Sequence, residues 1–229
     1  MSIQDLPTYI EHTNLKPTLT QRDVEKLVAE AVEYNFHGVC VPPYWVKKVK
    51  RDLSQTNVQV VTVIGFPLGY NMSHVKVAEI QRAIQDGADE LDIVMNMTAF
   101  KSDSQGWAKI EVAQFAKLAH EFQKPIKMIL ETAYLSMDEI REACTFCKDA
   151  GADFVKTSTG FAPEGAKVEH IKLMREVVGD ALGVKASGGI RSLATALDMI
   201  TAGADRLGTS SGVKIMQELA ATKSSSKTN

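Results

Sequence analysis

The stretch GADELDIV (residues 87–94) opens with a triplet, Gly-Ala-Asp, that the chain repeats in GADFVKTS (151–158) and GADRLGTS (203–210). Each copy follows an amphipathic stretch and precedes a short apolar run. Glycine directly after a helical pattern is typical of a helix C-terminus, and the apolar run behind it is typical of a strand. Three copies with the same flanks therefore predict three copies of one helix–turn–strand unit.

The same alternation extends over the rest of the chain. Strands are predicted near 9–13, 38–42, 58–65, 89–95, 125–131, 153–157, 182–186 and 205–209. Helices are predicted near 20–34, 44–52, 73–86, 107–122, 136–149, 167–178, 191–202 and 212–221. Eight strands alternating with eight helices predict one α/β domain over residues 1–222, a closed (β/α)8 TIM barrel, a fold that typically takes about 250 residues.

Strand composition supports parallel strands inside the molecule. The run VVTVI (60–64) is rich in β-branched residues and does not alternate with polar ones, as in strands that are covered on both faces. An open doubly wound sheet is the alternative, but no Gly-x-Gly-x-x-Gly follows the first strand. The Ser- and Lys-rich end (223–229) predicts a disordered tail.

Composition excludes several classes of protein. The 229 residues are 45% hydrophobic and 24% charged, which is typical of a globular protein. A net charge of −2 gives no electrostatic footprint for nucleic acid or for a membrane surface. No apolar run approaches the roughly 18–20 residues of a membrane-spanning helix, and the N-terminus has no secretory pattern. Three cysteines in a chain of this length fit a reducing compartment, so a cytoplasmic protein is predicted.

The repeat also aligns candidate catalytic residues. Three positions after each triplet aspartate stand Asp92, Lys156 and Gly208. These residues belong to predicted strands 4, 6 and 8, and alternate strands of a barrel contribute to the same interior layer. Asp92 and Lys156 are therefore expected to point inward at one height, with Gly208 leaving room beside them. Charged groups are rarely buried unless they are paired or functional.

A second lysine, Lys185, lies on predicted strand 7, next to the strand of Lys156. Burial and a nearby cation both lower the pKa of a lysine, and a lysine that is neutral near pH 7 can attack a carbonyl and form a Schiff base. The alternative is that each lysine simply pairs with a carboxylate at the barrel rim. A lysine pair in register with an acid favours catalysis over that alternative.

Two glycine-rich turns follow the last two predicted strands. They read SGGIR (187–191) and GTSSG (208–212), and each opens a helix. Glycine lets backbone amides approach an anion, and a helix N-terminus adds partial positive charge. The loops after strands 7 and 8 are the recurrent phosphate site of this barrel. With KTSTG (156–160) beside them, they predict a phosphorylated substrate.

Other polar residues carry weaker signals. Cys144 and Cys147 have redox spacing, but they share the apolar stripe of a helix, which favours packing. The five histidines form no metal-spaced cluster, so no metal is predicted. His12 fits a hydrogen-bonding structural role. Glu131, at the end of predicted strand 5, either organises the polar site or forms an ion pair with a barrel lysine such as Lys127 or Lys156; both readings stay open.

Together, these motifs resemble the class I, Schiff-base type of deoxyribose-phosphate aldolase. The resemblance rests on VKTSTGF (155–161), VKASGGIR (184–191) and LGTSSG (207–212). It continues, in chain order, through EHTNLKP (11–17), VCVP (39–42), VIGFPLG (63–69), ELDIV (90–94) and ILET (129–132). The two lysine motifs in tandem are specific, whereas glycine turns alone are not.

The resemblance implies reversible cleavage of 2-deoxy-D-ribose 5-phosphate to D-glyceraldehyde 3-phosphate and acetaldehyde, a step of deoxyribonucleotide catabolism. It implies that Lys156 forms the Schiff base, that Lys185 lowers the pKa of Lys156, and that Asp92 relays protons through a bound water. It places phosphate contacts on Gly160, Gly188, Gly189, Gly208, Ser210 and Ser211. No cofactor is implied, the partners are the sugar phosphate and acetaldehyde, and a dimer or tetramer is expected.

Two departures from the family pattern stand out. Glu11 occupies a position where the family usually has aspartate, so its carboxylate is one methylene farther from the backbone. Some family members end in a tyrosine that reaches back into the site, whereas the last tyrosine here is Tyr134. Proton transfer is therefore expected to run through Asp92 inside the barrel.

Three alternative functions fit parts of this pattern. One is another Schiff-base barrel, such as a transaldolase-like enzyme or an aldolase for keto-sugar phosphates. A second is a barrel that binds a sugar phosphate without catalysis, which the presence of both lysines and the acid disfavours. A third is a metal-dependent aldolase, which the histidine pattern disfavours.

Overall fold

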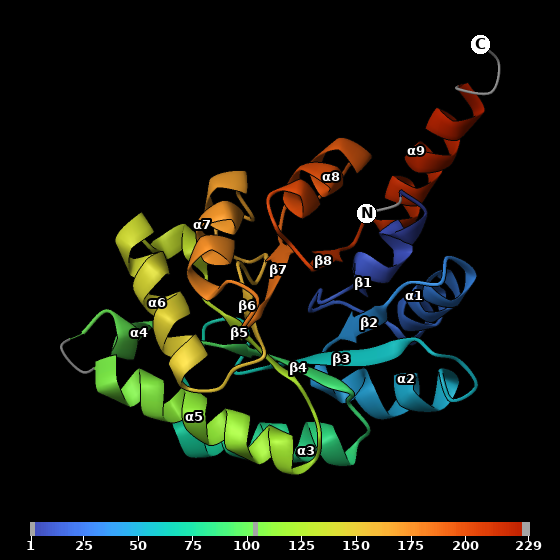
Figure 1. The fold of residues 1–229 in the computed structure, drawn as a ribbon. Coiled ribbons are helices and arrows are strands. Elements are labelled where there is room, and N and C mark those ends of the chain that lie inside the picture. Colours follow the sequence, from blue (N-terminus) through green and yellow to red (C-terminus); the bar gives the residue numbers. More distant parts are fainter. Residues whose placement is uncertain (1–2, 103–104, 226–229) are drawn as a thin grey trace.

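The computed structural model describes residues 3–102 and 105–225. Eight parallel strands close into a barrel in the order of the sequence, and helices surround it (Figure 1). The strands are β1 (Ile10–Thr13), β2 (Gly38–Val41), β3 (Gln59–Ile64), β4 (Glu90–Val94), β5 (Ile126–Ile129), β6 (Phe154–Lys156), β7 (Gly183–Ser187) and β8 (Arg206–Thr209). The (β/α)8 barrel predicted from the sequence is confirmed.

The helices of the outer layer also lie where the periodicity predicts them. They are α1 (Gln21–Glu33), α2 (Val46–Asp52), α3 (Ser73–Gln85), α5 (Gln105–Glu121), α6 (Met137–Asp149), α7 (Val168–Val178), α8 (Leu193–Thr201) and α9 (Gly212–Ser225). Capping boxes begin α1 at Thr20 and α6 at Ser136, so both starts are encoded locally.

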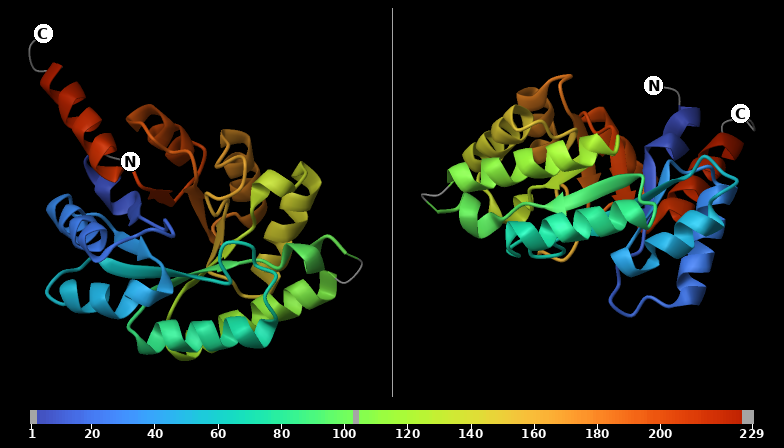
Figure 2. Two further views of the ribbon diagram at one scale, coloured as in Figure 1. Left: turned by 180° about the vertical axis from the view of Figure 1, so that it is seen from behind. Right: turned by 90° about the horizontal axis from the view of Figure 1, so that it is seen from below.

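Four short elements were not predicted as separate helices. They are α4 (Met97–Phe100) and the 3-10 helices η1 (Ile3–Tyr9), η2 (Pro43–Trp45) and η3 (Thr132–Tyr134), and one of them, η2, covers the start of the helix predicted near 44–52. Each is too short to show a helical period in the sequence. The helices η1 and α9 lie on the same side of the barrel (Figures 1 and 2). The predicted tail boundary at residue 223 falls inside α9; residues 226–229 lie outside the described residues, and their disorder stays a prediction.

The Gly-Ala-Asp repeat has a structural cause. Its glycines have positive φ angles of 101°, 85° and 115°, which end the preceding helices in a conformation that favours glycine. Its aspartates each accept a hydrogen bond from the first part of the neighbouring odd strand. The pairs are Val60 N with Asp89 at 3.0 Å, Ile126 N with Asp153 at 2.8 Å and Val184 N with Asp205 at 2.8 Å. Each triplet thus ends a helix, and its aspartate links the start of an even-numbered strand to the preceding odd-numbered strand by a hydrogen bond.

The barrel buries both apolar and charged side chains, and these form distinct groups. The main hydrophobic core lies between the barrel and its helices, and a smaller apolar cluster consists of Cys40, Val61 and Val63. Four charged side chains are also completely buried, namely Glu11, Asp92, Lys127 and Lys185. The barrel therefore holds these four charged groups away from water. Within residues 3–102 and 105–225, no helix is long and apolar enough to cross a membrane.

Candidate active site

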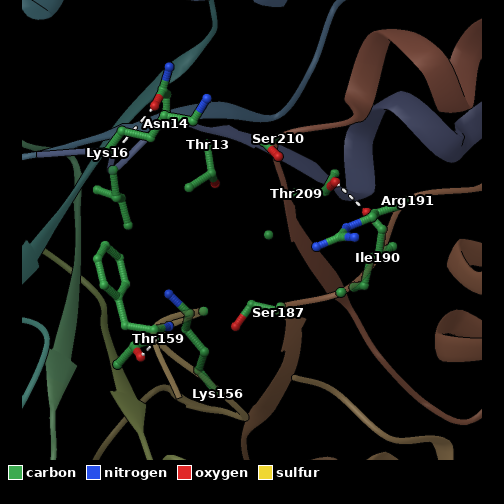
Figure 3. A pocket seen from close by; sticks show the side chains of 16 residues that line it. Thr13, Asn14, Lys16, Lys156, Thr159, Ser187, Ile190, Arg191, Thr209 and Ser210 are labelled. Atoms are coloured by element: carbon green, nitrogen blue, oxygen red, sulfur yellow. Dashed lines mark hydrogen bonds between the residues drawn. The ribbon is translucent and has the colours of Figure 1, made fainter. Parts of the chain in front are cut away.

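A pocket of about 280 Å³ opens at the carboxyl ends of the strands, and Lys156 lines it. Its walls come from the segments that follow β1, β6, β7 and β8. Figure 3 shows the side chains of Lys156 and Arg191 directed toward the same space from different walls. This is the end of the barrel at which enzymes of this fold hold their active sites.

Lys156, Asp92 and Lys185 meet directly below this pocket. The ammonium groups of Lys156 and Lys185 each donate to Asp92 Oδ2, both at 2.6 Å. Lys156 and Lys185 are register partners on β6 and β7, which explains why their side chains converge. The predicted inward alignment of Asp92 and Lys156, and the predicted closeness of the two lysines, are confirmed.

Four buried charges close a ring beneath Lys156, which we call the charge ring: Glu11, Asp92, Lys127 and Lys185. Asp92 contacts Lys185 through Oδ2 at 2.6 Å and Lys127 through Oδ1 at 3.1 Å. Glu11 pairs with Lys185 through Oε2 and lies 3.5 Å from Lys127 through Oε1. The ring therefore alternates anion and cation, and all four side chains have no solvent exposure.

A second pair extends the charge ring away from the pocket. Lys127 also pairs with Glu90, and Glu90 Oε1 lies 3.0 Å from Nε2 of His37. Among the residues that the structure describes, Glu11, His37 and Glu90 are the one group of three side chains close enough to hold a metal ion. The carboxylates of that group already have the Lys127 cation beside them.

These contacts shift the pKa values of Lys156 and Lys185 in opposite directions. Burial and the nearby Lys185 cation lower the pKa of Lys156, and the attraction of Asp92 offsets this only in part. Burial also disfavours the charged form of Lys185, but Asp92 and Glu11 more than compensate and raise its pKa. Burial is likewise outweighed at Asp92, where Lys127, Lys156 and Lys185 hold the pKa well below its usual value. Lys156 is thus the lysine of this pair that loses its proton first.

The glycine turns also line the pocket. Gly160, Gly188 and Gly189 have positive φ angles of 86°, 83° and 79°, so their backbone favours glycine. Five of the six residues predicted for phosphate binding line the pocket, namely Gly160, Gly188, Gly189, Gly208 and Ser210. Ser211 does not line it and lies with Lys214 and Glu30 along a neighbouring hollow that Ser210 also lines.

Gly208 leaves space for the side chain of Lys185. A Cβ atom at this position would lie 3.2 Å from Cε of Lys185 and 3.0 Å from Cβ of Ser187. The absence of a side chain therefore leaves the space that the stem of Lys185 crosses. This agrees with the room that the register predicted beside the catalytic layer.

Glu131 organises a loop of the pocket. Its carboxylate accepts hydrogen bonds from N and Oγ1 of Thr159, at 3.2 Å for the backbone nitrogen. It forms no ion pair with Lys127 or Lys156, so of the two open readings the structure favours the organising role. Burial raises the pKa of Glu131 even though Thr159 donates to it.

The structure gives His12 and the cysteines structural or packing roles, as the sequence predicts. His12 Nε2 lies 2.8 Å from Glu30, as a structural role predicts. Cys144 and Cys147 are buried in the main core and are free thiols. Burial raises the pKa of the Cys40 thiol to about 11 and that of Cys144 to about 12, so neither is a thiolate near neutral pH.

Sequence reasoning did not assign several residues of this site. Lys16 and Arg191 bring positive charge to the pocket wall, and Thr13 and Asn14 line it as well. The sequence predicts Lys127 only as an ion-pair partner for Glu131, whereas Lys127 bridges Glu11, Glu90 and Asp92. A charge inside a short apolar strand, as in IKMI (126–129), was the available signal.

Comparison with known proteins agrees with this geometry. A model of the DeoC/LacD family of aldolases matches residues 8–218. A protein of Thermococcus kodakarensis named deoxyribose-phosphate aldolase is 52% identical, over 95% of this chain and 98% of its own. The solved structure of an aldolase called QR15 is 45% identical with a TM-score of 0.90, covering 95% of this chain and 96% of its own. A structure described as a unique tetrameric deoxyribose phosphate aldolase from Aeropyrum pernix is 35% identical with a TM-score of 0.90, covering 96% and 93%.

Proposed function

Since the chain belongs to the DeoC/LacD family of aldolases, we propose that it reversibly cleaves 2-deoxy-D-ribose 5-phosphate to D-glyceraldehyde 3-phosphate and acetaldehyde. The observation that carries this proposal is the state of Lys156. It is a buried lysine that lines the pocket, and burial together with the Lys185 cation lowers its pKa. A neutral amine at this place is a carbonyl nucleophile.

The first step joins Lys156 to the sugar. The neutral Nζ adds to the C1 aldehyde of the open-chain substrate and forms a carbinolamine. The carbinolamine hydroxyl takes up one proton from water and leaves as water, which gives an iminium ion; the same proton returns to water when the iminium is hydrolysed at the end of the cycle. The iminium carries a positive charge at the position where the free enzyme has a neutral amine. Asp92 Oδ2, which lies 2.6 Å from Nζ in the free enzyme, stabilises that charge.

The second step breaks the C2–C3 bond. The C3 hydroxyl loses its proton as the bond electrons move toward the iminium and form an enamine, and glyceraldehyde 3-phosphate leaves. Asp92 is the anion available to take this proton, because the buried cations around it, Lys127 and Lys185 among them, keep it ionised. Asp92 is completely buried, so we assign the transfer to a water molecule between Asp92 and the substrate.

The last steps return the enzyme to its starting state. The enamine accepts a proton at C2 and becomes the iminium of acetaldehyde. Water adds to this iminium, acetaldehyde leaves, and Nζ of Lys156 is free again. The fixed cation Lys185 keeps Lys156 neutral for the next cycle, because like charges in a buried layer disfavour each other.

The decisive experiment measures both turnover and the covalent intermediate. Deoxyribose 5-phosphate should yield glyceraldehyde 3-phosphate in a coupled assay, and acetaldehyde with borohydride should add mass to the peptide that holds Lys156. Activity should survive EDTA, since an iminium supplies the electron sink that a metal otherwise provides. Use of dihydroxyacetone phosphate as the preferred donor, label on Lys185 alone, or zinc-restorable loss of activity in EDTA would contradict the proposal.

If the pocket binds the phosphate of the substrate, substitution of Ser210 should raise the KM, whereas substitution of the adjacent Ser211 should not. Ser210 lines the pocket with Arg191, whereas Ser211 does not. Loss of a hydrogen bond to a charged group costs about 1.5–3 kcal/mol, so Arg191→Ala should raise the KM for deoxyribose 5-phosphate about tenfold or more. Ser210→Ala should raise this KM less, Ser211→Ala should leave it unchanged, and unphosphorylated deoxyribose should be affected by none of the three. Equal losses with both sugars would remove the phosphate assignment.

Two further properties belong to the same proposal. We infer a cytoplasmic location, supported by free, buried thiols at Cys40, Cys144 and Cys147. We also infer a homo-oligomer, dimer or tetramer, supported by the similar Aeropyrum pernix protein that is described as tetrameric.

A further inference from the structure

Two hollows adjoin each other at the mouth of the barrel. The first is the pocket of about 280 Å³ that Lys156 lines. The second, which we call the apolar hollow, has a volume of about 540 Å³. Most of its lining is apolar, with Leu19, Tyr44, Trp45, Val63, Phe66 and three prolines. Leu15 and Lys16 line both hollows, so the two share a wall.

A pair of aromatic rings lies between the pocket and the apolar hollow. Phe161 lines the pocket, and Phe66 lines the apolar hollow. The two rings meet edge to face, with centroids 5.3 Å apart and an interplanar angle of 90°, which is a favoured geometry for aromatic pairs. Phe66 follows β3 and Phe161 follows β6, so the pair joins loops that are three strands apart in the barrel. Together with Leu15, these rings form what we call the aromatic partition.

The ring of Phe66 is fixed from the inside of the barrel. Phe66 and Leu15 pack against the smaller apolar cluster of Cys40, Val61 and Val63. The residue before Phe66 is also held, because Oε2 of Glu79 on α3 accepts a hydrogen bond of 2.6 Å from the backbone nitrogen of Gly65. Phe66 is therefore a fixed part of the wall.

The ring of Phe161 is held by its backbone and not by burial. Glu131 accepts hydrogen bonds from N and Oγ1 of Thr159, and this Oγ1 accepts from the backbone nitrogen of Phe161 at 3.1 Å. The Phe161 side chain itself is half-exposed. Removal of this ring therefore opens the partition without leaving a cavity in the hydrophobic core.

The aromatic partition lies on the side of the pocket away from Arg191. Figure 3 shows Arg191 on one side of the space, and Lys16 and Thr159 on the other. Leu15 directly precedes Lys16, and Phe161 follows Thr159 by two residues. A substrate chain that extends from Lys156 toward Arg191 therefore meets polar groups, whereas one that extends toward Phe161 meets apolar rings.

We propose that Phe66 and Phe161 are specificity-determining residues, which close the pocket toward the apolar hollow and restrict it to aldehydes with a short or polar chain. The inference rests on the proposed function, because it concerns the aldehyde that joins acetaldehyde in the reverse reaction. In that reaction, C2 of the enamine on Lys156 bonds to the carbonyl carbon of the aldehyde, and the carbonyl oxygen takes up a proton. Hydrolysis of the resulting iminium releases the product and frees Nζ.

The test compares two aldehydes as partners for acetaldehyde, namely D-glyceraldehyde 3-phosphate and hexanal, whose chain is apolar. The measured quantity is kcat/KM for hexanal divided by kcat/KM for glyceraldehyde 3-phosphate. The double variant Phe66→Ala with Phe161→Ala should raise this ratio about tenfold or more, because several methylene groups of hexanal then enter the apolar hollow and each one buried contributes severalfold.

Two controls separate the apolar hollow from general loosening of the site. Phe122→Ala removes a ring that is 53% exposed, close to the 52% of Phe161, and that lines neither hollow, so the ratio should stay at the wild-type value. Leu19→Trp fills the apolar hollow and not the pocket, because Leu19 lines only the former of the two. Added to the double variant, Leu19→Trp should cancel more than half of the rise.

Each outcome decides the inference. A rise of about tenfold or more that Leu19→Trp cancels supports it. A smaller rise, an equal rise in Phe122→Ala, or a rise that Leu19→Trp leaves in place overturns it. If the double variant does not fold, Phe161→Ala, which removes only the half-exposed ring, is judged by the same limits. Failure of wild type to join acetaldehyde to glyceraldehyde 3-phosphate would instead contradict the proposed function, so the two failures are distinguishable.

Discussion

Lys156→Met should lower turnover of deoxyribose 5-phosphate about 10⁴-fold or more, as loss of a catalytic nucleophile does in other enzymes. A thioether cannot add to an aldehyde, so neither iminium nor enamine can form. The variant should still fold, because Asp92 keeps its contacts with Lys127 at 3.1 Å and with Lys185 at 2.6 Å. The measurements are the coupled assay and borohydride labelling with acetaldehyde.

Lys156→Arg is the matched control for charge. It restores a cation beside Asp92, yet a guanidinium stays protonated and is no nucleophile. Both variants should therefore be inactive and unlabelled, while their thermal unfolding resembles that of wild type. Turnover within tenfold of wild type in either variant would exclude Lys156 as the covalent residue.

Asp92→Asn should separate imine formation from turnover. The amide cannot take the proton of the C3 hydroxyl, and general acid–base contributions of this kind amount to about 10²–10⁴-fold. Imine formation should survive, because loss of the anion that raises the pKa of Lys156 leaves that amine neutral over a wider pH range. Labelling of Lys156 should thus persist while cleavage falls by about 10²-fold or more.

Hydrogen–deuterium exchange at the methyl group of acetaldehyde tests the same residue directly. This exchange requires proton transfer at the enamine, so Asp92→Asn should lose it. Asp153→Asn is the matched control, because Asp153 accepts from Ile126 N at 2.8 Å on the strand pair and does not line the pocket. Exchange at the wild-type rate in Asp92→Asn would show that another group moves the proton.

Much of the fold was predictable because its signals are local. The positive φ of Gly87, Gly151 and Gly203 ends three helices, and the apolar runs behind them become even strands. The hydrogen bonds of the triplet aspartates to the odd strands were not predictable, since they join residues 27 or 29 positions apart in two of the three cases. The helices η1, η3 and α4 were missed because segments of three to seven residues are too short to show a helical periodicity.

The site was predictable in part for the same reason. Equal spacing from the triplets placed Asp92 and Lys156 in one layer, and strand adjacency brought Lys185 beside them. The turns for which phosphate binding is predicted were visible as glycine clusters before helices. Ser210 and Ser211 were indistinguishable in the sequence, and only the structure shows that Ser210 lines both the pocket and the neighbouring hollow, whereas Ser211 lines the hollow and not the pocket.

By itself, the sequence determined the closed order of strands, the layer of Asp92 and Lys156, and the turns that line the pocket. These features follow from periods and spacings, which are local properties of a chain. Only the tertiary structure decided how Glu11, Asp92, Lys127 and Lys185 pair, because they come from β1, β4, β5 and β7 and meet only when the barrel closes. Protonation depends on burial and on these contacts across the barrel, so the lowered pKa of Lys156 and the raised pKa of Lys185 are properties of the folded state.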